Sequence, residues 1–426
     1  MTAPAGWALR LYLAATPLLA PLAPALLRRR LKRGKEDPAR MSEKLGQTGA
    51  RRPSGPLVWL HAVGLGEVMA LRGLIDELAA QAPGLSFLVT STARSSASVF
   101  AANLPPRTQH QFLPIDAPRF YRPFFDHWRP DLSVWSEQDL WPGMVVEAAR
   151  RDIPLALVNG RLNPRAAAAR GRAGGLYGDL YARFSLLAAQ DAETAAALTR
   201  LGAKGPVLTH VSLKAATPPL SVDAAALQAM RRELARRRVW CLASSHDFDE
   251  AIALAAHRQI VKSDPRALLI IAPRQPGRGA GIAGAAEKAG LAVSLRASAN
   301  GPQLPRPGDQ VHVADTFGEM GLWYRLCPAV LMGGTFGPVE GHNPWEPARL
   351  GAAVLHGPRT ANFAADYARL DGEDAALAVA DAAALVTALG RDLTAMATRG
   401  QALATAGSQD VTILATRLLA LMPGRG

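Results

Sequence analysis

Short runs of apolar residues recur along the chain and alternate with longer stretches in which apolar positions repeat at helical spacing. Continuous apolar runs of this kind indicate strands that are buried on both faces, because a strand with one wet face alternates apolar and polar positions. Strands that alternate with helices predict an α/β protein, in which helices cover both faces of parallel sheets.

The strand candidates fall into two groups. The first half of the chain contains Leu57–Leu60, Ser86–Thr90, Leu132–Val134, Leu155–Val158 and Leu186–Ala189, and the second half contains Val239–Ala243, Ala267–Ala272, Leu291–Ser294, Val311–Val313, Ala329–Met332 and Ala353–Leu355. A helix is predicted over Glu67–Gln81. The segment Ala299–Asp309, which is rich in Pro and Gly, predicts a surface loop. The Ala/Leu-rich stretch Asp381–Leu421 predicts helices that cross back to brace the first half.

The segment Ala215–Asp223 separates the two groups, since it contains prolines and neither periodicity nor a long apolar run. We therefore divide the chain into an N-terminal segment (1–35), a first domain (36–215) and a second domain (216–426). Two α/β domains joined by a linker predict a ligand cleft between them, at the carboxyl ends of the strands of both sheets.

An apolar run, Trp7–Leu27, opens the chain and is interrupted by Arg10 and three prolines. At about 1.5 Å per residue, a helix of this length just reaches across a hydrocarbon layer of about 30 Å. Dense basic charge follows the run, whereas a cleaved secretory signal carries its charge first. We expect an uncleaved membrane anchor that spans the bilayer or lies in its interface and keeps the domains in the cytoplasm. The alternative is a soluble helix packed on the body.

About half of the formal net charge of +13 lies in one segment. Residues 28–52 contain ten Lys/Arg and three Asp/Glu, which gives a local net charge of +7. This cluster indicates contact with anionic headgroups or a phosphorylated lipid, and its alternative role is a solvated stop signal. The two cysteines, Cys241 and Cys327, form no metal-binding or redox motif, which predicts a reduced compartment and no zinc site.

The motif WLHAVGLGEV at residues 59–68 places two glycines where a strand gives way to a helix. Glycines permit a tight turn, and the N–H groups of the helix start can hold an anion. A dinucleotide-binding loop needs a third glycine where Met69 stands, so a nicotinamide enzyme is disfavoured. Glu67 would present a carboxylate to the cleft, and its alternative role is a helix-start acid stabilised by the helix dipole.

Two further motifs place charged residues directly after strands, where parallel folds keep their reactive groups. In SEQDLWPG, Glu137 follows the strand, and we expect Asp139 to cap the helix that Pro142 begins. In IIAPRQPGR, Arg274 follows the strand and its guanidinium suits a phosphate, although a solvated arginine is the alternative.

The remaining motifs, DTFGEM and GGTFGPVEGHNPWEP, also follow strands. The pair Gly333 and Gly334 predicts backbone amides that are open to a phosphate. Glu346 stands at a helix start, where an acid can accept both hydroxyls of a ribose.

These motifs resemble, in order and over nearly the whole chain, the Kdo (3-deoxy-manno-octulosonic acid) transferase family of GT-B glycosyltransferases. The matching strings are HAVGLGE, LPIDAP, SEQDLWPG, VNGRL, AAQDAET, VSLK, SSHDFDE, APRQPGR, DTFGEM, GGTFGPVEGHNPWEPA and GPRTANF. The last three are the most specific.

The resemblance implies the α/β GT-B architecture, with two Rossmann-like domains whose parallel sheets face a central cleft, and an N-terminal membrane-anchor helix. It implies an inverting transfer of Kdo from CMP-Kdo to a lipid A precursor, lipid IVA, in lipopolysaccharide core biosynthesis. The acceptor would bind the first domain and the CMP-sugar the second, with no metal and no cofactor. The implied partners are these two substrates and an anionic membrane surface, with no nucleic acid, and the implied location is the cytoplasmic face of the inner membrane.

The family's functional residues map onto matching positions of this chain. Glu67 matches the general base that deprotonates the acceptor hydroxyl. Glu137 and Lys214 match residues that stabilise the transition state. The segments that match the CMP-binding parts of the family contain Pro273, Arg274, Gly318, Glu319, Met320, Asn343, Pro344, Trp345 and Glu346.

The chain departs from the family pattern at three places. It has Gln138-Asp139 in place of Thr-Glu, Val211-Ser212 in place of Gly-Asn, and Gln275-Pro276 in place of His-Pro. The second change affects the backbone setting of Lys214. The alternative functions are a GT-B transferase that uses a UDP-sugar on another membrane lipid, and a catalytically silent nucleotide- or lipid-binding module.

Overall fold

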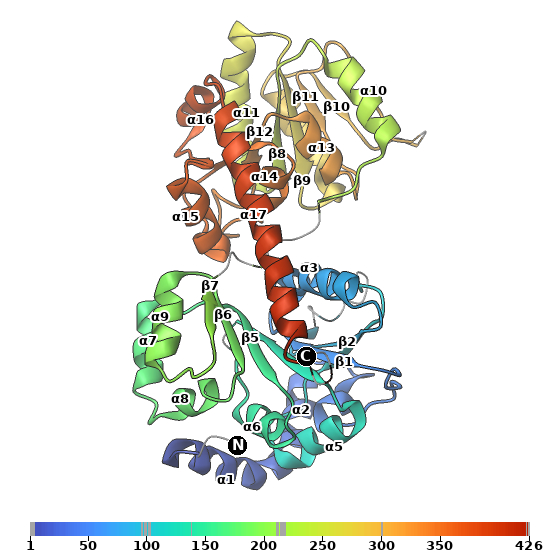
Figure 1. Ribbon diagram of the computed structural model, residues 1–426. Coiled ribbons are helices and arrows are strands. Elements are labelled where there is room, and N and C mark those ends of the chain that lie inside the picture. Colours follow the sequence, from blue (N-terminus) through green and yellow to red (C-terminus); the bar gives the residue numbers. More distant parts are fainter. Residues whose placement is uncertain are drawn as a thin grey trace. The chain divides into compact units, whose positions relative to one another are not determined.

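Two compact units make up the computed structural model, which describes residues 5–94, 97, 100, 104–137, 139–209, 213, 219–299, 301–422 and 424 (Figure 1). The first unit comprises Met1–Thr217 and Gly407–Gly426, and the second comprises Pro218–Ala406. Each contains a seven-stranded sheet, and every strand pair among the described residues is parallel. The α/β class with two parallel sheets, predicted from the apolar runs, is confirmed.

The sheet of the first unit has the strand order β3-β2-β1-β4-β5-β6-β7. Its strands are β1 (Leu57–His61), β2 (Ser86–Ser91), β3 (Thr108–Phe112), β4 (Leu132–Ser136), β5 (Leu155–Gly160), β6 (Leu186–Ala189) and β7 (Val207–Thr209). Its helices are α1 (Trp7–Leu19), η1 (Ala20–Leu22), α2 (Ala23–Lys32), η2 (Met41–Leu45), α3 (Leu65–Gln81), α5 (Pro118–Trp128), α6 (Pro142–Arg150), α7 (Pro164–Gly171), α8 (Leu176–Tyr181) and α9 (Ala192–Arg200).

Alternate residues of the central strand β1 enter two different apolar layers, because successive side chains of a strand point to opposite faces. Val58 and Leu60 pack with the buried face of α3. Trp59, on the other face, packs with α5 and α6 residues, and its ring meets those of Phe124 at 5.1 Å and Trp135 at 5.3 Å, edge to face. The sheet is therefore the middle of three layers.

The N-terminal helices lie on the second of these layers, where α1 packs against α5, α6 and α8 (Figure 1). Leu9 and Leu27 are buried, and the Tyr12 hydroxyl donates to the Asp116 carboxylate at 2.8 Å. Among the described residues, Trp7–Lys32 is the one helical stretch long and apolar enough to cross a membrane. Its other side exposes a row of large apolar side chains: Trp7, Leu11, Leu18, Leu19, Leu22 and Leu26.

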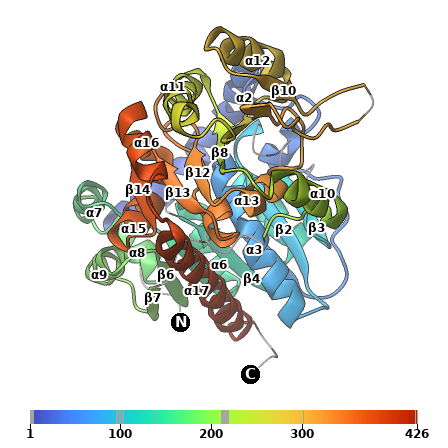
Figure 2. The same ribbon diagram turned by 90° about the horizontal axis from the view of Figure 1, so that it is seen from above.

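The sheet of the second unit has the order β10-β11-β9-β8-β12-β13-β14. Its strands are β8 (Val239–Ser245), β9 (Leu268–Pro273), β10 (Val293–Leu295), β11 (Val311–Val313), β12 (Ala329–Met332), β13 (Ala353–His356) and β14 (Ala376–Ala378). Its helices are α10 (Ala224–Leu234), α11 (Asp247–Ser263), η4 (Pro276–Arg278), α12 (Gly279–Lys288), α13 (Met320–Leu326), α14 (Trp345–Arg349), η5 (Ala361–Phe363), α15 (Ala364–Gly372) and α16 (Ala382–Leu389). Figure 2 shows α11 and α16 side by side, and both supply apolar residues to one layer of the core.

The last helix, α17 (Thr394–Leu419), contributes residues to both units. Its carboxyl-terminal part enters the core of the first unit through Val411, Leu414 and Leu418, which pack with the α3 side of the first sheet. The backbone carbonyl of Thr412 accepts a hydrogen bond from Gln81 Nε2 at 3.0 Å. The predicted helical stretch and its return to the first half are thus both observed.

The strands that the apolar runs missed lie at sheet edges. The central strands are found within one or two residues of their predicted bounds, but β3, β7 and β14 were not predicted. An edge strand is short or has polar positions because only one neighbour pairs with it, so it lacks a continuous apolar run. The fourth edge strand, β10, was predicted two residues too early.

The fold should lose stability on mild acidification because five histidines are held neutral. Burial lowers the pKa of His61 and His110 to about 3, and that of His257, His312 and His342 to about 4. Unfolded histidine has a pKa of about 6.5, so the unfolded chain binds more protons below that value, and stability declines as the pH falls from about 6.5 towards 4. Urea unfolding at a series of pH values measures this decline.

The acid sensitivity should persist in about 0.5 M salt, which screens the repulsion among surface charges but not the burial of the rings. An unfolding free energy that stays constant across this pH window would contradict the prediction.

Candidate active site

Each sheet has a point where successive connections leave in opposite directions. In the first sheet it lies between β1 and β4, and in the second between β8 and β12. Loops that follow two such strands diverge, and the crevice between them is where open α/β sheets bind ligands. Glu67 follows β1 and Glu137 follows β4, so both predicted carboxylates belong to the crevice of the first unit.

Glu67 lies in the first turn of α3, and its own carboxylate caps that helix. Oε2 accepts hydrogen bonds from the backbone N–H groups of Val63 and Gly64, each at 3.1 Å. The amides of Val63 and Gly64, just before the helix, are therefore occupied by the protein's own carboxylate, and an anion at the N–H groups of the helix start itself stays a prediction. Gly64 also leaves room for the carboxylate, because a Cβ there would lie 3.1 Å from Oε1 of Glu67.

Glu137 adopts a left-handed backbone conformation, with φ of 62°, directly after β4. Its N–H donates to the carbonyl of Val158 at 2.9 Å, and Oε1 accepts a hydrogen bond from Nδ2 of buried Asn159 at 3.3 Å. Asn159 Oδ1 in turn accepts the N–H of Leu213 at 3.1 Å. Asn159 thus connects Glu137 to Leu213, the residue before Lys214. Lys214 lies outside the described residues.

Asp139 does not cap the helix that Pro142 begins. The buried Asp116 takes this role, because its carboxylate accepts the N–H groups of Gly143 and Met144, each at 2.8 Å. Burial raises the pKa of Asp139, and the nearby charge of Glu67 raises it further. Asp139 is therefore a third acid of this crevice, after Glu67 and Glu137, and lies close enough to Glu67 to be influenced by its charge.

In the second unit, two histidines link the loops on either side of the β8/β12 crevice. His246 follows β8, and its Nε2 lies 3.0 Å from Nε2 of His342, with the rings stacked at 11°. Burial lowers the pKa of His342 to about 4, and the charges of His246 and Arg274 act in the same direction. His342 is thus neutral at physiological pH, and the exposed Arg274 lies close enough to influence it electrostatically.

The predicted acid of this crevice, Glu346, lies beside Arg274 and Asn343. Burial raises the pKa of Glu346, whereas Asn343 and Arg274 act to lower it. Asn343 Oδ1 accepts the N–H of Trp345 at 3.1 Å, and the buried indole of Trp345 donates to Asp366 at 2.8 Å. Pro344 directly precedes α14. The loop is therefore held by the hydrogen bond of Asn343 before this proline and by that of Trp345 after it.

The glycines after β12 do not offer open amides, which corrects the prediction for Gly333 and Gly334. The fully buried Asp249 accepts the N–H groups of Gly334 at 2.7 Å, Thr335 at 3.2 Å and Phe336 at 3.1 Å. The N–H of Gly333 donates to a β8 carbonyl, and a Cβ at Gly333 would lie 2.3 Å from the carbonyl oxygen of Ser244. Glycine is required here by the close approach of two backbones.

The last predicted segment, Gly318 to Met320, follows β11 and enters α13. Gly318 has φ of 83°, a conformation that favours glycine. Glu319 forms a two-pronged ion pair with Arg296, at 2.6 and 3.0 Å. Partial burial alone would raise the pKa of Glu319, but the hydrogen bonds from Arg296 and Thr316 hold it below its ordinary value. The Glu319 side chain therefore fixes its own loop.

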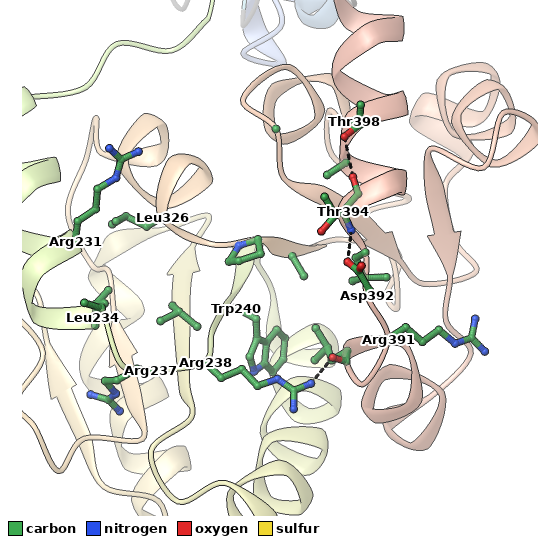
Figure 3. Close-up of a pocket in the computed structure, with 18 of the residues that line it drawn as sticks. Arg231, Leu234, Arg237, Arg238, Trp240, Leu326, Arg391, Asp392, Thr394 and Thr398 are labelled. Carbon is green, nitrogen blue, oxygen red and sulfur yellow. Dashed lines mark hydrogen bonds between the residues drawn. The ribbon is translucent and has the colours of Figure 1, made fainter.

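A separate cavity of about 580 Å³ lies at the opposite edge of the second sheet, at the amino ends of β8 and β12 (Figure 3). Two hydrogen bonds join residues of its wall: Arg238 donates to the carbonyl of Leu389, and the N–H of Thr394 donates to Asp392 at 2.9 Å. Reactive groups of parallel sheets gather at the carboxyl ends of the strands, so this cavity is a structural feature.

Sequence reasoning did not identify three residues that organise the two crevices: Asn159, His246 and Asp249. The signal for Asn159 was its position at the carboxyl end of the strand β5, and His246 and Asp249 come directly after the strand β8 of the second sheet. Their partners are 54, 96 and 85 positions away in the chain. Sequence spacing alone therefore could not pair them.

The chain is similar to proteins of one enzyme family. The family model for 3-deoxy-D-manno-octulosonic-acid transferase (kdotransferase) matches residues 39–217. A probable mitochondrial 3-deoxy-D-manno-octulosonic acid transferase of Arabidopsis thaliana is 34% identical over 83% of this chain and 80% of the relative. The 3-deoxy-D-manno-octulosonic acid transferase of Rickettsia bellii is 32% identical over 82% of each chain.

A solved structure supports the fold. The UDP-GlcNAc 2-epimerase of Neisseria meningitidis, bound to UDP-GlcNAc, matches with a TM-score of 0.54 over 86% of this chain and 100% of the epimerase. The two sequences are 11% identical, so this likeness concerns the fold alone, and it confirms the GT-B type of architecture.

The loop after β12 should not tolerate a side chain at its first glycine. We expect Gly333→Ala to lower the free energy of unfolding by at least about 2 kcal/mol, because the Cβ would overlap the Ser244 carbonyl. Gly281→Ala is the matched control, since a Cβ there meets no heavy atom within 4 Å and alanine favours the helix by up to about 1 kcal/mol. Equal unfolding midpoints for the two variants in urea would contradict the prediction.

Asn159 should contribute to stability in two separable ways. Its φ of 56° is tolerated by asparagine but strained for alanine, by about 1–2 kcal/mol. We expect Asn159→Gly to lose only the side-chain hydrogen bonds, about 1–2 kcal/mol, and Asn159→Ala to lose stability through both effects. Chemical denaturation of the two variants measures the difference, and an alanine variant as stable as the glycine variant would refute the backbone contribution.

Proposed function

The chain belongs to the 3-deoxy-D-manno-octulosonic acid transferase family and is a glycosyltransferase, and from that premise we propose that it transfers Kdo from CMP-Kdo to lipid IVA. The reaction needs neither metal nor cofactor in this proposal. The observation that carries it is the pair of acids, Glu67 and Glu137, at the crevice of the first unit. A hydroxyl nucleophile needs a positioned base, and this crevice supplies one on a fixed helix start.

In the proposed mechanism, Glu67 removes the proton of the acceptor hydroxyl. Both of its hydrogen bonds from described backbone groups are accepted by Oε2, so Oε1 is the oxygen that would receive the proton. The hydroxyl oxygen forms a bond to the anomeric carbon of Kdo while the bond from that carbon to the CMP phosphate breaks. A single displacement inverts the anomeric centre. Glu137 and Lys214 would stabilise the transition state.

The CMP-sugar would bind the second unit. Arg274 at the end of β9 offers a guanidinium for the phosphate, and the neighbouring Pro273 fixes where the strand ends. Glu346, held beside Asn343 and Arg274, would accept the ribose hydroxyls, as acids do in other nucleotide-binding α/β proteins. The segment Gly318–Met320 would complete the nucleotide site. When the bond to Kdo breaks, CMP leaves with a negative charge on its phosphate. Arg274 and Lys214 would balance that charge.

The protein would act at the cytoplasmic face of the inner membrane. The exposed apolar row of the N-terminal helices and the basic residues that follow it support this location. Apolar side chains enter the acyl region, and basic residues next to them meet anionic headgroups.

Incubation of the purified protein with CMP-Kdo and lipid IVA in EDTA tests the proposal. We expect CMP release and a gain in the mass of the lipid by one or more Kdo units. No CMP release from folded protein would exclude CMP-Kdo as the donor, and CMP release with unchanged lipid would exclude lipid IVA as the acceptor.

Glu67→Gln should fold normally and lose activity. Glutamine can still accept from Val63 and Gly64, so thermal stability should stay close to that of the wild type. Loss of the base should lower kcat by about 10²–10⁴-fold. Glu77→Gln is the matched control, because it makes the same change later in the same helix. A Glu67→Gln enzyme with wild-type kcat would remove Glu67 from the role of base.

A further inference from the structure

A second cavity, of about 710 Å³, lies entirely within the first unit. The N-terminal helices form one wall with Thr16, Ala20 and Leu27, and the loops after β3 and β4 form the other with Ile115 and Trp141. Protein cores contain few voids larger than a water molecule, and ligand pockets measure about 300–1,000 Å³. The size of this cavity is that of a ligand site rather than of a packing defect.

The wall is suited to an apolar occupant. Most of the side chains that face the cavity are aliphatic or aromatic. Several of its polar groups are already paired, since the Tyr12 hydroxyl donates to Asp116 and the Lys44 ammonium donates to both Glu36 and the carbonyl of Thr92. None of the buried side-chain polar atoms that lack a partner, in the part of the chain that the structure describes, belongs to the lining. A polar ligand would therefore find few groups to bind.

The lining of the cavity contains two functionally different groups of residues. The first group includes Leu19 and Leu26, which are 60% and 57% exposed and belong to the apolar row of the N-terminal helices. The second group includes Val63, whose N–H binds the carboxylate of Glu67, and Asp139, whose pKa the charge of Glu67 influences. The cavity thus borders both an exposed apolar surface and the carboxylates of the crevice.

We propose that this cavity binds one acyl chain of the lipid acceptor, with the sugar hydroxyl that attacks the donor beside Glu67. The inference rests on the proposed acceptor and adds a binding site for its hydrocarbon part. A molecule that carries both a sugar and an acyl chain matches a lining that contains both residues next to Glu67 and exposed apolar side chains.

The surroundings favour a membrane lipid as the occupant over a second protein. Six of the eleven exposed large hydrophobic side chains among the described residues lie on this one helical stretch. Exposed basic residues lie at and just after its carboxyl-terminal end, including Arg28, Arg29 and Arg33. An apolar row with adjoining cations is the surface that lies in a bilayer interface with anionic lipids. A chain could therefore pass from the bilayer into the cavity without crossing water.

Filling the cavity tests the proposal. Thr16 faces the cavity from α1, and Thr16→Trp should occupy part of its volume. Each methylene kept out of an apolar site lowers affinity by about fourfold, so we expect at least a tenfold rise in KM for lipid IVA. The KM for the same acceptor after removal of its acyl chains should not change.

Two control variants separate the cavity from the helix. Ala14→Trp places the same side chain at an exposed position of α1 outside the lining, and Thr16→Val removes the hydroxyl without filling space. Both should keep the wild-type KM for lipid IVA. A folded Thr16→Trp enzyme with wild-type KM for lipid IVA, or with equal effects on both acceptors, would overturn the proposal.

A binding measurement distinguishes this proposal from the acceptor assignment itself. If the wild-type enzyme transfers Kdo to neither acceptor, the acceptor assignment fails, and the cavity is judged by its affinity for a fluorescent dodecanoic acid. Wild type and Ala14→Trp should bind this probe, and Thr16→Trp should bind it at least tenfold more weakly. Equal binding by all three would show that the cavity takes no acyl chain.

Discussion

Parallel strand pairing is the constraint on which the rest of the structure depends. In a parallel sheet the carboxyl ends of all strands lie on the same side, so the loops that follow them meet there even when they are distant in sequence. The strand orders of the two sheets then place β1 beside β4, and β8 beside β12, with their connections leaving in opposite directions. In one unit Glu67 and Glu137 follow neighbouring strands, and in the other His246 and His342 meet, because of this order rather than through any local motif.

Buried or partly buried carboxylates hold the loops at these strand ends. Glu67, Asp116 and Asp249 each accept two or more backbone N–H groups. An ionised carboxylate forms stronger hydrogen bonds with amides than a neutral acceptor does, and an amide left without a partner in these positions would be costly. The fold therefore uses carboxylates to hold its loops through hydrogen bonds. A catalytic base that accepts such hydrogen bonds is also fixed in position for catalysis.

The N-terminal helices are relevant both to membrane binding and to the active site. They are attached to the first unit by buried leucines and by the hydrogen bond between Tyr12 and Asp116, and their other side is apolar and exposed. The same helices form a wall of the cavity whose lining also includes Asp139. The proposed lipid acceptor would have its apolar chain and its reacting hydroxyl brought to one part of the protein by this arrangement.

The sequence by itself determined the α/β class, the central strands and the residues after each strand, because strands buried on both faces require continuous apolar runs. Its motifs also carried the family resemblance. The edge strands β3, β7 and β14 were not predicted, because a strand that pairs on one side only has no continuous apolar run. Only the tertiary structure decided which groups the loop residues bind: Asp249 occupies the amides after Gly333, and Asp116 replaces Asp139 at the start of α6. Such partners are chosen by the approach of distant backbones, which depends on the packed fold and has no local signature in the chain.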